Sequence, residues 1–172
     1  MRTPQLDALP PGDARWVEVD IADQRMTVWH GQKAQWHCLV STAAAGPGQR
    51  EGSGQTPLGW HVIRAAIGHG QPTGAVYRGR RPTGEVFDPA LAAAHPERDW
   101  ILTRILWLSG LERGHNRGGD VDSQRRYIYF HGTPPDKPMG DADSHGCIRL
   151  RDDDLLRLFD EARPGTPVWL HD

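Results

Sequence analysis

Two neighbouring stretches carry most of the information about the fold, Tyr127-Ile128-Tyr129-Phe130-His131-Gly132-Thr133 and, after a proline-containing loop, Ser144-His145-Gly146-Cys147-Ile148-Arg149-Leu150. The first alternates as a β-strand does, so we expect Tyr127, Tyr129 and His131 to share one face. The second passes through a glycine into a short apolar run. The sequence therefore predicts a strand that ends beside a loop rich in reactive side chains.

Two short helices are predicted outside this region. One covers 89–95, with Asp88 as its N-cap and a proline at its first position. The other follows Leu150 and runs to about Ala162, with Asp152 and Asp153 as candidate caps. Its core face is expected to hold Leu155, Leu156, Leu158 and Phe159.

Most other regular segments have the two-residue period of β-strands. Such segments lie at 16–21, 26–29, 34–42, 60–67 and 101–108, and a last strand at 168–170 is expected to close the sheet. The glycine-rich stretches 43–54 and 68–88 are predicted to be loops without regular structure, the second of them beside the site. The chain is therefore expected to be mainly β with short helices.

Length and composition indicate one domain and exclude some classes of protein. The 172 residues, 37% of them hydrophobic, suffice for a single core, which we expect to follow an N-terminal lead at 1–15 and to occupy 16–172. A formal charge of −2 argues against nucleic-acid binding. Arg78, Arg80 and Arg81 cluster among Gly and Pro, as in a solvated loop or a site for an anionic substrate.

The N-terminal residues and the cysteines bear on location. Met1 to Trp16 contains three prolines and several charges, with no apolar stretch of about 7–15 residues, so no secretion signal is predicted. No run of about 18 apolar residues is present, so no membrane span is predicted. We expect a cytoplasmic protein, or a periplasmic one if an export signal has been removed. Cys38, in a strand-like run, is expected to be a buried thiol without a role.

Cys147 is the candidate nucleophile. A thiol becomes nucleophilic when it loses its proton, and an imidazole is the common base for this step. His131 and His145 are both candidates for that base, and the spacing does not decide between them. A base held on a separate strand is oriented independently of the nucleophile, which favours His131. The amides of Gly146 and Cys147 are candidates for an oxyanion hole.

Three other interpretations of these residues compete with a nucleophilic cysteine. The Cys and the two His are individually typical of scattered core residues. Together, His131, His145 and Cys147 are good zinc ligands, but their spacing matches no common zinc pattern. A redox-active thiol would need a resolving cysteine, and none is nearby. No metal and no cofactor is therefore predicted.

At the level of motifs, the chain resembles the L,D-transpeptidase catalytic domain, also called the YkuD-type domain. The resemblance is carried by His131-Gly132-Thr133, by 144–149, and by Gln55-Thr56-Pro57-Leu58-Gly59, which is similar to a Thr-Pro-x-Gly segment of that family. It extends from about Trp16 to Leu170. It implies a single-domain β-sandwich or barrel-like fold and a cysteine that forms an acyl-enzyme with stem peptides of peptidoglycan.

Transferred by position, the resemblance also implies roles for individual residues. Cys147 would be the nucleophile, His131 the base and later acid, and the carbonyl of Gly132 would orient His131. Further residues would line the site as substrate contacts, with Arg149 a candidate to bind a substrate carboxylate through its planar fork. These contacts are Ser144, His145, Arg149 and Tyr129.

Three functions follow as expectations. The favoured one is an L,D-carboxypeptidase that cleaves the bond between meso-diaminopimelate and D-alanine in tetrapeptides during wall recycling, because the chain has no predicted export signal. The first alternative is an L,D-transpeptidase that forms crosslinks or exchanges D-amino acids. The second is a non-catalytic module that binds muropeptides or metal. The expected partners are stem peptides or muropeptides.

Overall fold

The computed structural model describes residues 1–172, and strands dominate it. The strands are β1 (Arg15–Asp20), β2 (Arg25–His30), β3 (Lys33–Leu39), β4 (Gly59–Ile67), β5 (Ala75–Arg78), β6 (Arg81–Val86), β7 (Leu102–Gly110), β8 (Tyr129–Gly132), β9 (Ile148–Leu150) and β10 (Pro167–His171). The helices are α1 (Pro89–Ala94), α2 (Asp152–Glu161) and the 3-10 turns η1 (Leu6–Ala8) and η2 (Gly119–Val121). The chain is thus mainly β and a single domain, as predicted.

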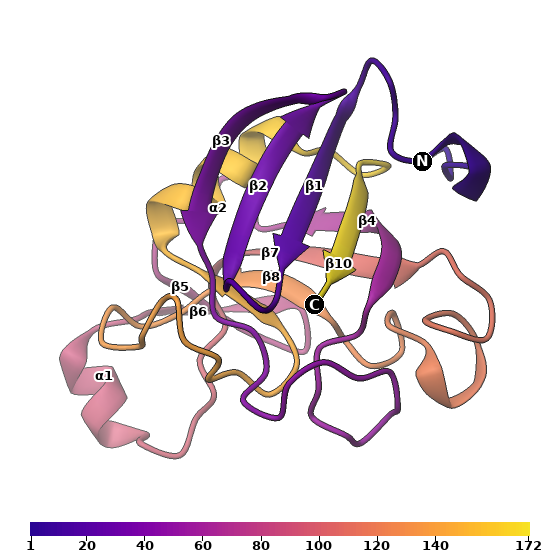
Figure 1. Cartoon of the computed structure of the whole chain (residues 1–172). Coiled ribbons are helices and arrows are strands. Elements are labelled where there is room, and N and C mark those ends of the chain that lie inside the picture. The colour runs from indigo at the N-terminus through magenta and orange to yellow at the C-terminus, as the bar shows by residue number, and fades with distance from the viewer.

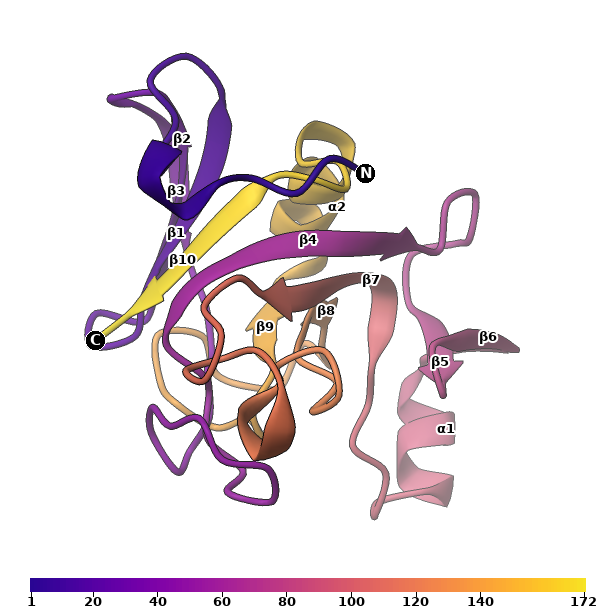
Figure 2. The same ribbon diagram turned by 90° about the vertical axis from the view of Figure 1, so that its right-hand side faces the viewer.

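All ten strands belong to one mixed sheet. Its main order is β3-β2-β1-β10-β4-β7-β5-β6, and β8 and β9 branch from β7. Only the β1–β10 and β8–β9 pairs are parallel. The sheet curls, so that β1 to β3 lie on one side of the molecule and β7, β8 and α2 on the other (Figures 1 and 2). The curl encloses one core.

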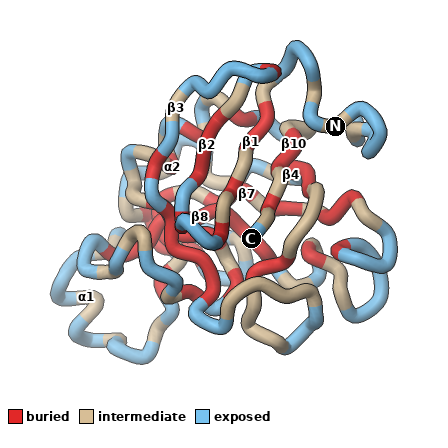
Figure 3. The backbone as a smooth tube through the Cα atoms, in the orientation of Figure 1, coloured by how far each residue is buried: buried red, intermediate tan, exposed pale blue.

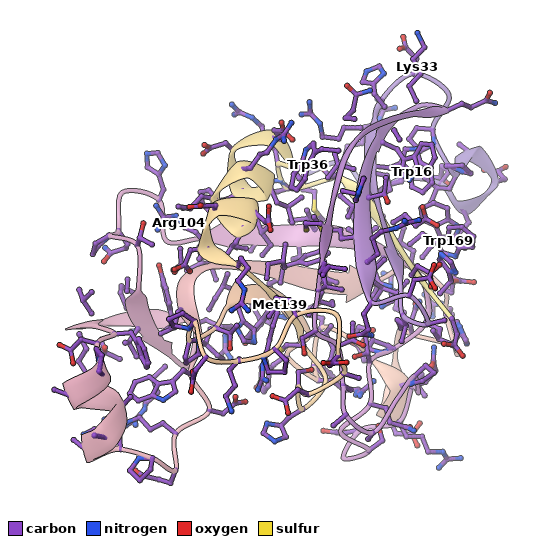
Figure 4. The ribbon with its side chains drawn as sticks, turned by 60° about the vertical axis from the view of Figure 1, so that its left-hand side comes forward. Trp16, Lys33, Trp36, Arg104, Met139 and Trp169 are labelled. Carbon is purple, nitrogen blue, oxygen red and sulfur yellow. The ribbon has the colours of Figure 1, made fainter.

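The main core lies between the inner face of the curled sheet and α2. It contains 19 buried residues, contributed by both sides of the curl and by Leu155 and Leu158 of the helix. Figure 3 shows the buried positions gathered at the centre, with the exposed positions in the outer loops. Figure 4 shows Trp36 and Arg104 on either side of α2, where the indole of Trp36 donates to Glu161 and the guanidinium of Arg104 lies over Phe159. The helix is therefore held at both flanks.

Several predicted elements are confirmed. The meander at 16–42 forms β1, β2 and β3, with antiparallel pairing throughout. Asp88 caps α1 by accepting from the amide of Leu91, and Pro89 is the first helical residue. Cys38 is 9% exposed within the main core, where burial raises its pKa to about 12. No helix has the length and apolar character needed to cross a membrane.

The prediction that 68–88 lacks regular structure was wrong, because β5 and β6 form a hairpin there. Gly74 and Gly79 have positive φ beside and between the strands, where the turns require it. Ala75, Val76 and Tyr77 supply the burial that holds the hairpin, because β5 packs against β7. Gly74 and Gly79 therefore mark the turns of the hairpin.

Three further details differ from the predictions. β8 begins at Tyr129, because Tyr127 has a φ of 56° and belongs to a turn. Arg151 is the N-cap residue of α2 and makes no side-chain cap bond, while Asp152 accepts from the hydroxyl of Thr103 instead. The strand at 167–171 does not close the sheet. It lies in the middle of the sheet, between β1 and β4.

Candidate active site

The site lies where β8 and β9 run side by side. Their parallel register sets His131 opposite Arg149. Because side chains alternate along strands, Tyr129 and Cys147, each two residues earlier, are directed toward the same face. His131 and Cys147 line one cavity of about 150 Å³, together with Asp99, Ile101, Arg126, Tyr127, Ile128, Ser144, His145, Gly146 and Arg149. The two parts of the motif are thereby brought together.

His131 is fixed by its own neighbour in sequence. Its Nδ1 lies 2.7 Å from the carbonyl oxygen of Gly132. A carbonyl can only accept, so Nδ1 carries the hydrogen and the lone pair is on Nε2. The residue is 2% exposed, and this burial lowers its pKa to about 4, although the Gly132 bond acts in the opposite direction. At neutral pH the ring is therefore a neutral base with one available nitrogen.

Gly132 is required by close packing. A Cβ at this position would lie 2.7 Å from the carbonyl oxygen of Leu102 and 2.9 Å from a carboxylate oxygen of Asp152. Both distances are too short for a carbon atom. Any larger residue would displace the carbonyl that orients His131, so the glycine keeps β7, β8 and α2 in contact behind the imidazole.

The sulfur of Cys147 lies between two main-chain groups. It accepts from the amide of Tyr129 at 3.4 Å and donates to the carbonyl of Tyr127 at 3.2 Å. Burial raises the pKa of the thiol to about 12, and the carboxylate of Asp99 adds to this rise, whereas Arg149 and Arg126 oppose it. The resting thiol is neutral. Its hydrogen must leave the Tyr127 carbonyl before it can pass to His131.

The loop in front of Cys147 is held by hydroxyl groups. Ser144 donates from Oγ to the carbonyl of Cys147 at 2.6 Å and accepts from the amide of Gly146 at 3.2 Å. Thr56, fully buried, donates to the carbonyl of Gly146 at 2.9 Å. Gly146 has a φ of 133°, which L-residues rarely adopt. Of the two predicted oxyanion donors, the Gly146 amide is thus engaged, and the Cys147 amide makes no hydrogen bond within the chain.

Arg149 is buried and neutralised by two carboxylates. Its Nη2 lies 3.1 Å from Asp99 and its Nη1 2.8 Å from Asp143, while its Nε is buried without a partner. The side chain is 4% exposed. Both ends of the guanidinium are therefore occupied by the protein, which leaves little of the planar fork for a substrate.

His145 is placed differently from His131. Its side chain is 77% exposed, and its Nδ1 lies 3.1 Å from Asp99, which thus bridges His145 and Arg149. Both residues of this contact border the cavity. His131 is buried and oriented by a main-chain carbonyl, whereas His145 is exposed and contacts a half-exposed carboxylate. The geometry accordingly favours His131 as the base.

Tyr129 and Tyr127 have unequal surroundings. Tyr129 is 4% exposed, packs in a small cluster with Ala75, Tyr77 and Ile105, and contacts Cys147. Its hydroxyl accepts from Arg80 at 3.2 Å. Tyr127 is 51% exposed and is one of the residues that line the cavity. Tyr129 therefore supports the sulfur from behind, and Tyr127 faces solvent.

Sequence reasoning missed Asp99 and Arg126, which line the cavity. Asp99 precedes β7 and reaches the site because Leu102 pairs with Gly132 at the end of β8. Arg126 donates to the carbonyls of Gly48, Gln49 and Gln55, and so ties the 48–55 loop to the site. No local spacing signals either residue, because both contacts depend on how distant strands pair. The cavity mouth and its loop are thus products of tertiary structure.

The residues do not form a metal site. No group of three or more His, Cys, Asp and Glu side chains is arranged to hold an ion. The three candidate zinc ligands have other partners: His131 contacts Gly132, His145 contacts Asp99, and Cys147 contacts the main chain of Tyr127 and Tyr129.

Comparisons with known proteins agree on the fold. A 39-residue segment is 55% identical to "Probable L,D-transpeptidase YcfS" of Escherichia coli (strain K12), covering 23% of this chain and 12% of that protein. An L,D-transpeptidase from Mycobacterium smegmatis superposes with a TM-score of 0.55 at 16% identity, over 92% of this chain and 59% of the other. Bd1075 of Bdellovibrio bacteriovorus gives 0.58 at 14% identity, over 99% and 51%. The chain thus spans less than two thirds of each relative.

The match to a family covers nearly the whole chain. The family described as "YkuD: L,D-transpeptidase catalytic domain" matches residues 14–170, from just before β1 to the penultimate residue of β10. This range includes Thr56, His131 and Cys147. The chain therefore belongs to the YkuD family of L,D-transpeptidase catalytic domains.

Proposed function

We propose that the chain is a peptidoglycan-modifying enzyme in which residues 16–172 form the catalytic domain and Cys147 is an acylated nucleophile. The observation that carries this proposal is the shared cavity of Cys147 and His131, in which the Nδ1 contact to Gly132 leaves Nε2 free. A neutral imidazole beside a neutral thiol supports general-base activation during attack. The substrate class, stem peptides or muropeptides, follows from the family.

In the first half-reaction, the Cys147 sulfur attacks the carbonyl carbon of the L,D bond while its proton passes to Nε2 of His131. The Cys147 amide stabilises the resulting oxyanion. His131 then protonates the leaving nitrogen, the C–N bond breaks, and a D-amino acid departs. What remains is a thioester between Cys147 and the L-centre of the donor peptide.

In the second half-reaction, an acceptor cleaves the thioester. We propose water as that acceptor, which makes the enzyme an L,D-carboxypeptidase. His131 takes a proton from water, the C–S bond breaks, and the thiol regains its proton. An open polar mouth supports hydrolysis, because His145 and Asp99, with side chains 77% and 46% exposed, border the cavity. A peptide amine in place of water would give a crosslink.

The test is incubation with a tetrapeptide that ends in meso-diaminopimelate and D-alanine, followed by mass spectrometry. Release of D-alanine and a tripeptide is expected, with a thioester on Cys147 at early times. Cys147→Ser should abolish release, and Cys38→Ala is the matched control that should retain it. If only dimers or D-amino-acid exchange products formed, the activity would be that of a transpeptidase and not of a carboxypeptidase. If no thioester formed on Cys147, the proposal of a cysteine acyl-enzyme would be contradicted. Cell fractionation checks the predicted cytoplasmic location.

A further inference from the structure

The leaving residue of the proposed donor carries a free carboxylate, and its binding requires a cation near Cys147. This inference rests on the proposed function and concerns its substrate specificity. Three arginines lie in or beside the site, Arg149, Arg126 and Arg80. Their partners in the folded chain decide which of them is available.

Arg149 and Arg126 are already engaged. Arg149 is paired with both Asp99 and Asp143 and is almost fully buried. Arg126 gives its two terminal nitrogens to the 48–55 loop. A carboxylate that approached either residue would have to displace existing partners, so the assignment of Arg149 made from the family resemblance is not supported by its surroundings.

Arg80 is available. It lies at the tip of the β5–β6 hairpin, and its guanidinium carbon is 4.5 Å from the ring centroid of Tyr127 and 5.1 Å from that of Trp107. One nitrogen donates to the Tyr129 hydroxyl at 3.2 Å. No carboxylate lies within ion-pair distance, so most of its five N–H donors are free. Aromatic faces hold the group in place without cancelling its charge.

The hairpin brings Arg80 over the site at a conformational cost. Arg80 has a φ of 65° and Tyr127, beneath it, a φ of 56°, and such strain in non-glycine residues is typical of functional positions. Tyr127 lines the Cys147 cavity, and its carbonyl holds the thiol. A second cavity of about 290 Å³, lined by Arg78 and Gly79, shares Asp99 and Ile101 with the first. The two cavities are thus neighbours, and Arg80 reaches the edge of the Cys147 cavity through its contact with the ring of Tyr127.

We propose that Arg80 binds the C-terminal carboxylate of the donor peptide, the carboxylate of the D-amino acid that leaves. A guanidinium presents paired donors that match the two oxygens of a carboxylate. Held by Tyr127, Tyr129 and Trp107, it fixes the last residue of the donor while the carbonyl in front of it faces Cys147. Arg80 is thus a specificity residue that selects peptides with a free C-terminus.

The test separates binding from turnover. In a Cys147→Ser background, calorimetry measures the affinity for the tetrapeptide acid and for the same peptide with a C-terminal carboxamide. The acid should bind more tightly by about ten- to a hundredfold, as expected for hydrogen bonds between charged groups. Arg80→Gln should remove this preference and leave the affinity for the carboxamide unchanged. Arg80→Lys should retain part of it.

Arg81→Gln is the matched control, because Arg81 is exposed on the same hairpin and has no partner. It should behave as the parent protein. Equal losses for acid and carboxamide in Arg80→Gln would mean that Arg80 only shapes the hairpin, and an unchanged preference would place the carboxylate elsewhere. Binding of neither peptide would also overturn the proposal. If Arg80→Gln removes the preference for the peptide acid over the carboxamide, the role of Arg80 is supported even if the parent enzyme proves to be a transpeptidase that transfers to amines.

Discussion

The hydroxyl of Thr56 donates a hydrogen bond of 2.9 Å to the main-chain carbonyl of Gly146, the residue before the candidate nucleophile. The same hydroxyl accepts from the amide of Ala43 at 3.0 Å. In a trans peptide the carbonyl and the following N–H point in opposite directions. Anchoring the Gly146 carbonyl in the interior therefore turns the Cys147 amide away from it, which leaves this amide available as the proposed oxyanion donor.

Thr56→Val should lower kcat by between about ten- and a hundredfold, because it frees the peptide that carries an oxyanion donor. It also leaves two buried groups unpaired, at roughly 1–3 kcal/mol each in the free energy of unfolding. Thr56→Ser keeps the hydroxyl and should retain most of the activity. Steady-state kinetics and urea unfolding measure the two effects. A fully active Thr56→Val would show that the anchor is dispensable for catalysis.

Alanine substitution of His131 and of His145 should lower kcat to unequal extents. His131→Ala removes the proposed base of both half-reactions and should reduce kcat by about a hundred- to ten-thousandfold. His145→Ala removes an exposed partner of Asp99, so we expect a loss of less than about tenfold, since exposed ion pairs contribute little. D-alanine release reports both rates. The reverse order would make His145 the base.

The pH dependence should reveal a neutral pair in the resting enzyme. Because burial lowers the pKa of His131 to about 4 and raises that of Cys147 to about 12, neither group is charged near pH 7. We expect kcat/KM to rise as pH increases through about 4 and then to stay level across neutral pH. Alkylation of Cys147 by iodoacetamide should be slow at pH 7. Rapid alkylation there would instead indicate a preformed thiolate.

Stability should fall in mild acid through two buried histidines. Burial lowers the pKa of both His61 and His131 from 6.5 to about 4, so the unfolded chain binds protons that the native protein rejects between these values. Their contribution is complete above pH 6.5 and is lost toward pH 4, at roughly 3 kcal/mol for each residue. Urea unfolding across this range measures the loss.

His61→Gln should remove about half of that pH dependence, because it leaves only His131 to titrate in this way. His69→Gln is the control, since His69 is exposed in the turn after β4 and should leave the slope unchanged. If unfolding free energies were flat between pH 4 and 6.5, both histidines would titrate alike in the folded and unfolded states.

Local patterns predicted most strands, and the family resemblance implied the contact between His131 and the carbonyl of Gly132. Alternation identified β1, β2 and β4, and the Asp88-Pro89 pair identified the start of α1, because each signal lies within one segment. The hairpin at 75–86 was missed for the opposite reason. Its short strands are stabilised by burial against β7, which no pattern within the segment reveals.

At the site, the sequence predicted the reactive groups but not their surroundings. Nothing near Arg149 in the sequence indicates that Asp99, fifty residues earlier, neutralises it. The free guanidinium of Arg80 and the anchor at Thr56 likewise depend on pairing between distant strands. Charge compensation and donor availability are properties of the assembled structure, so a motif alone indicates candidate reactive groups but not which arginine remains unpaired.

The central position of β10 constrains how the chain acquires its structure. β10, at residues 167–171, lies between β1 and β4 in the sheet. It pairs with both strands, parallel to β1 and antiparallel to β4. Until the ribosome has made this segment, the N-terminal meander has no strand partner along the edge of β1, and β1 and β4 are not joined within the sheet. Folding during translation therefore cannot finish before the last strand emerges, and the nascent chain presents an unpaired edge that chaperones are suited to shield.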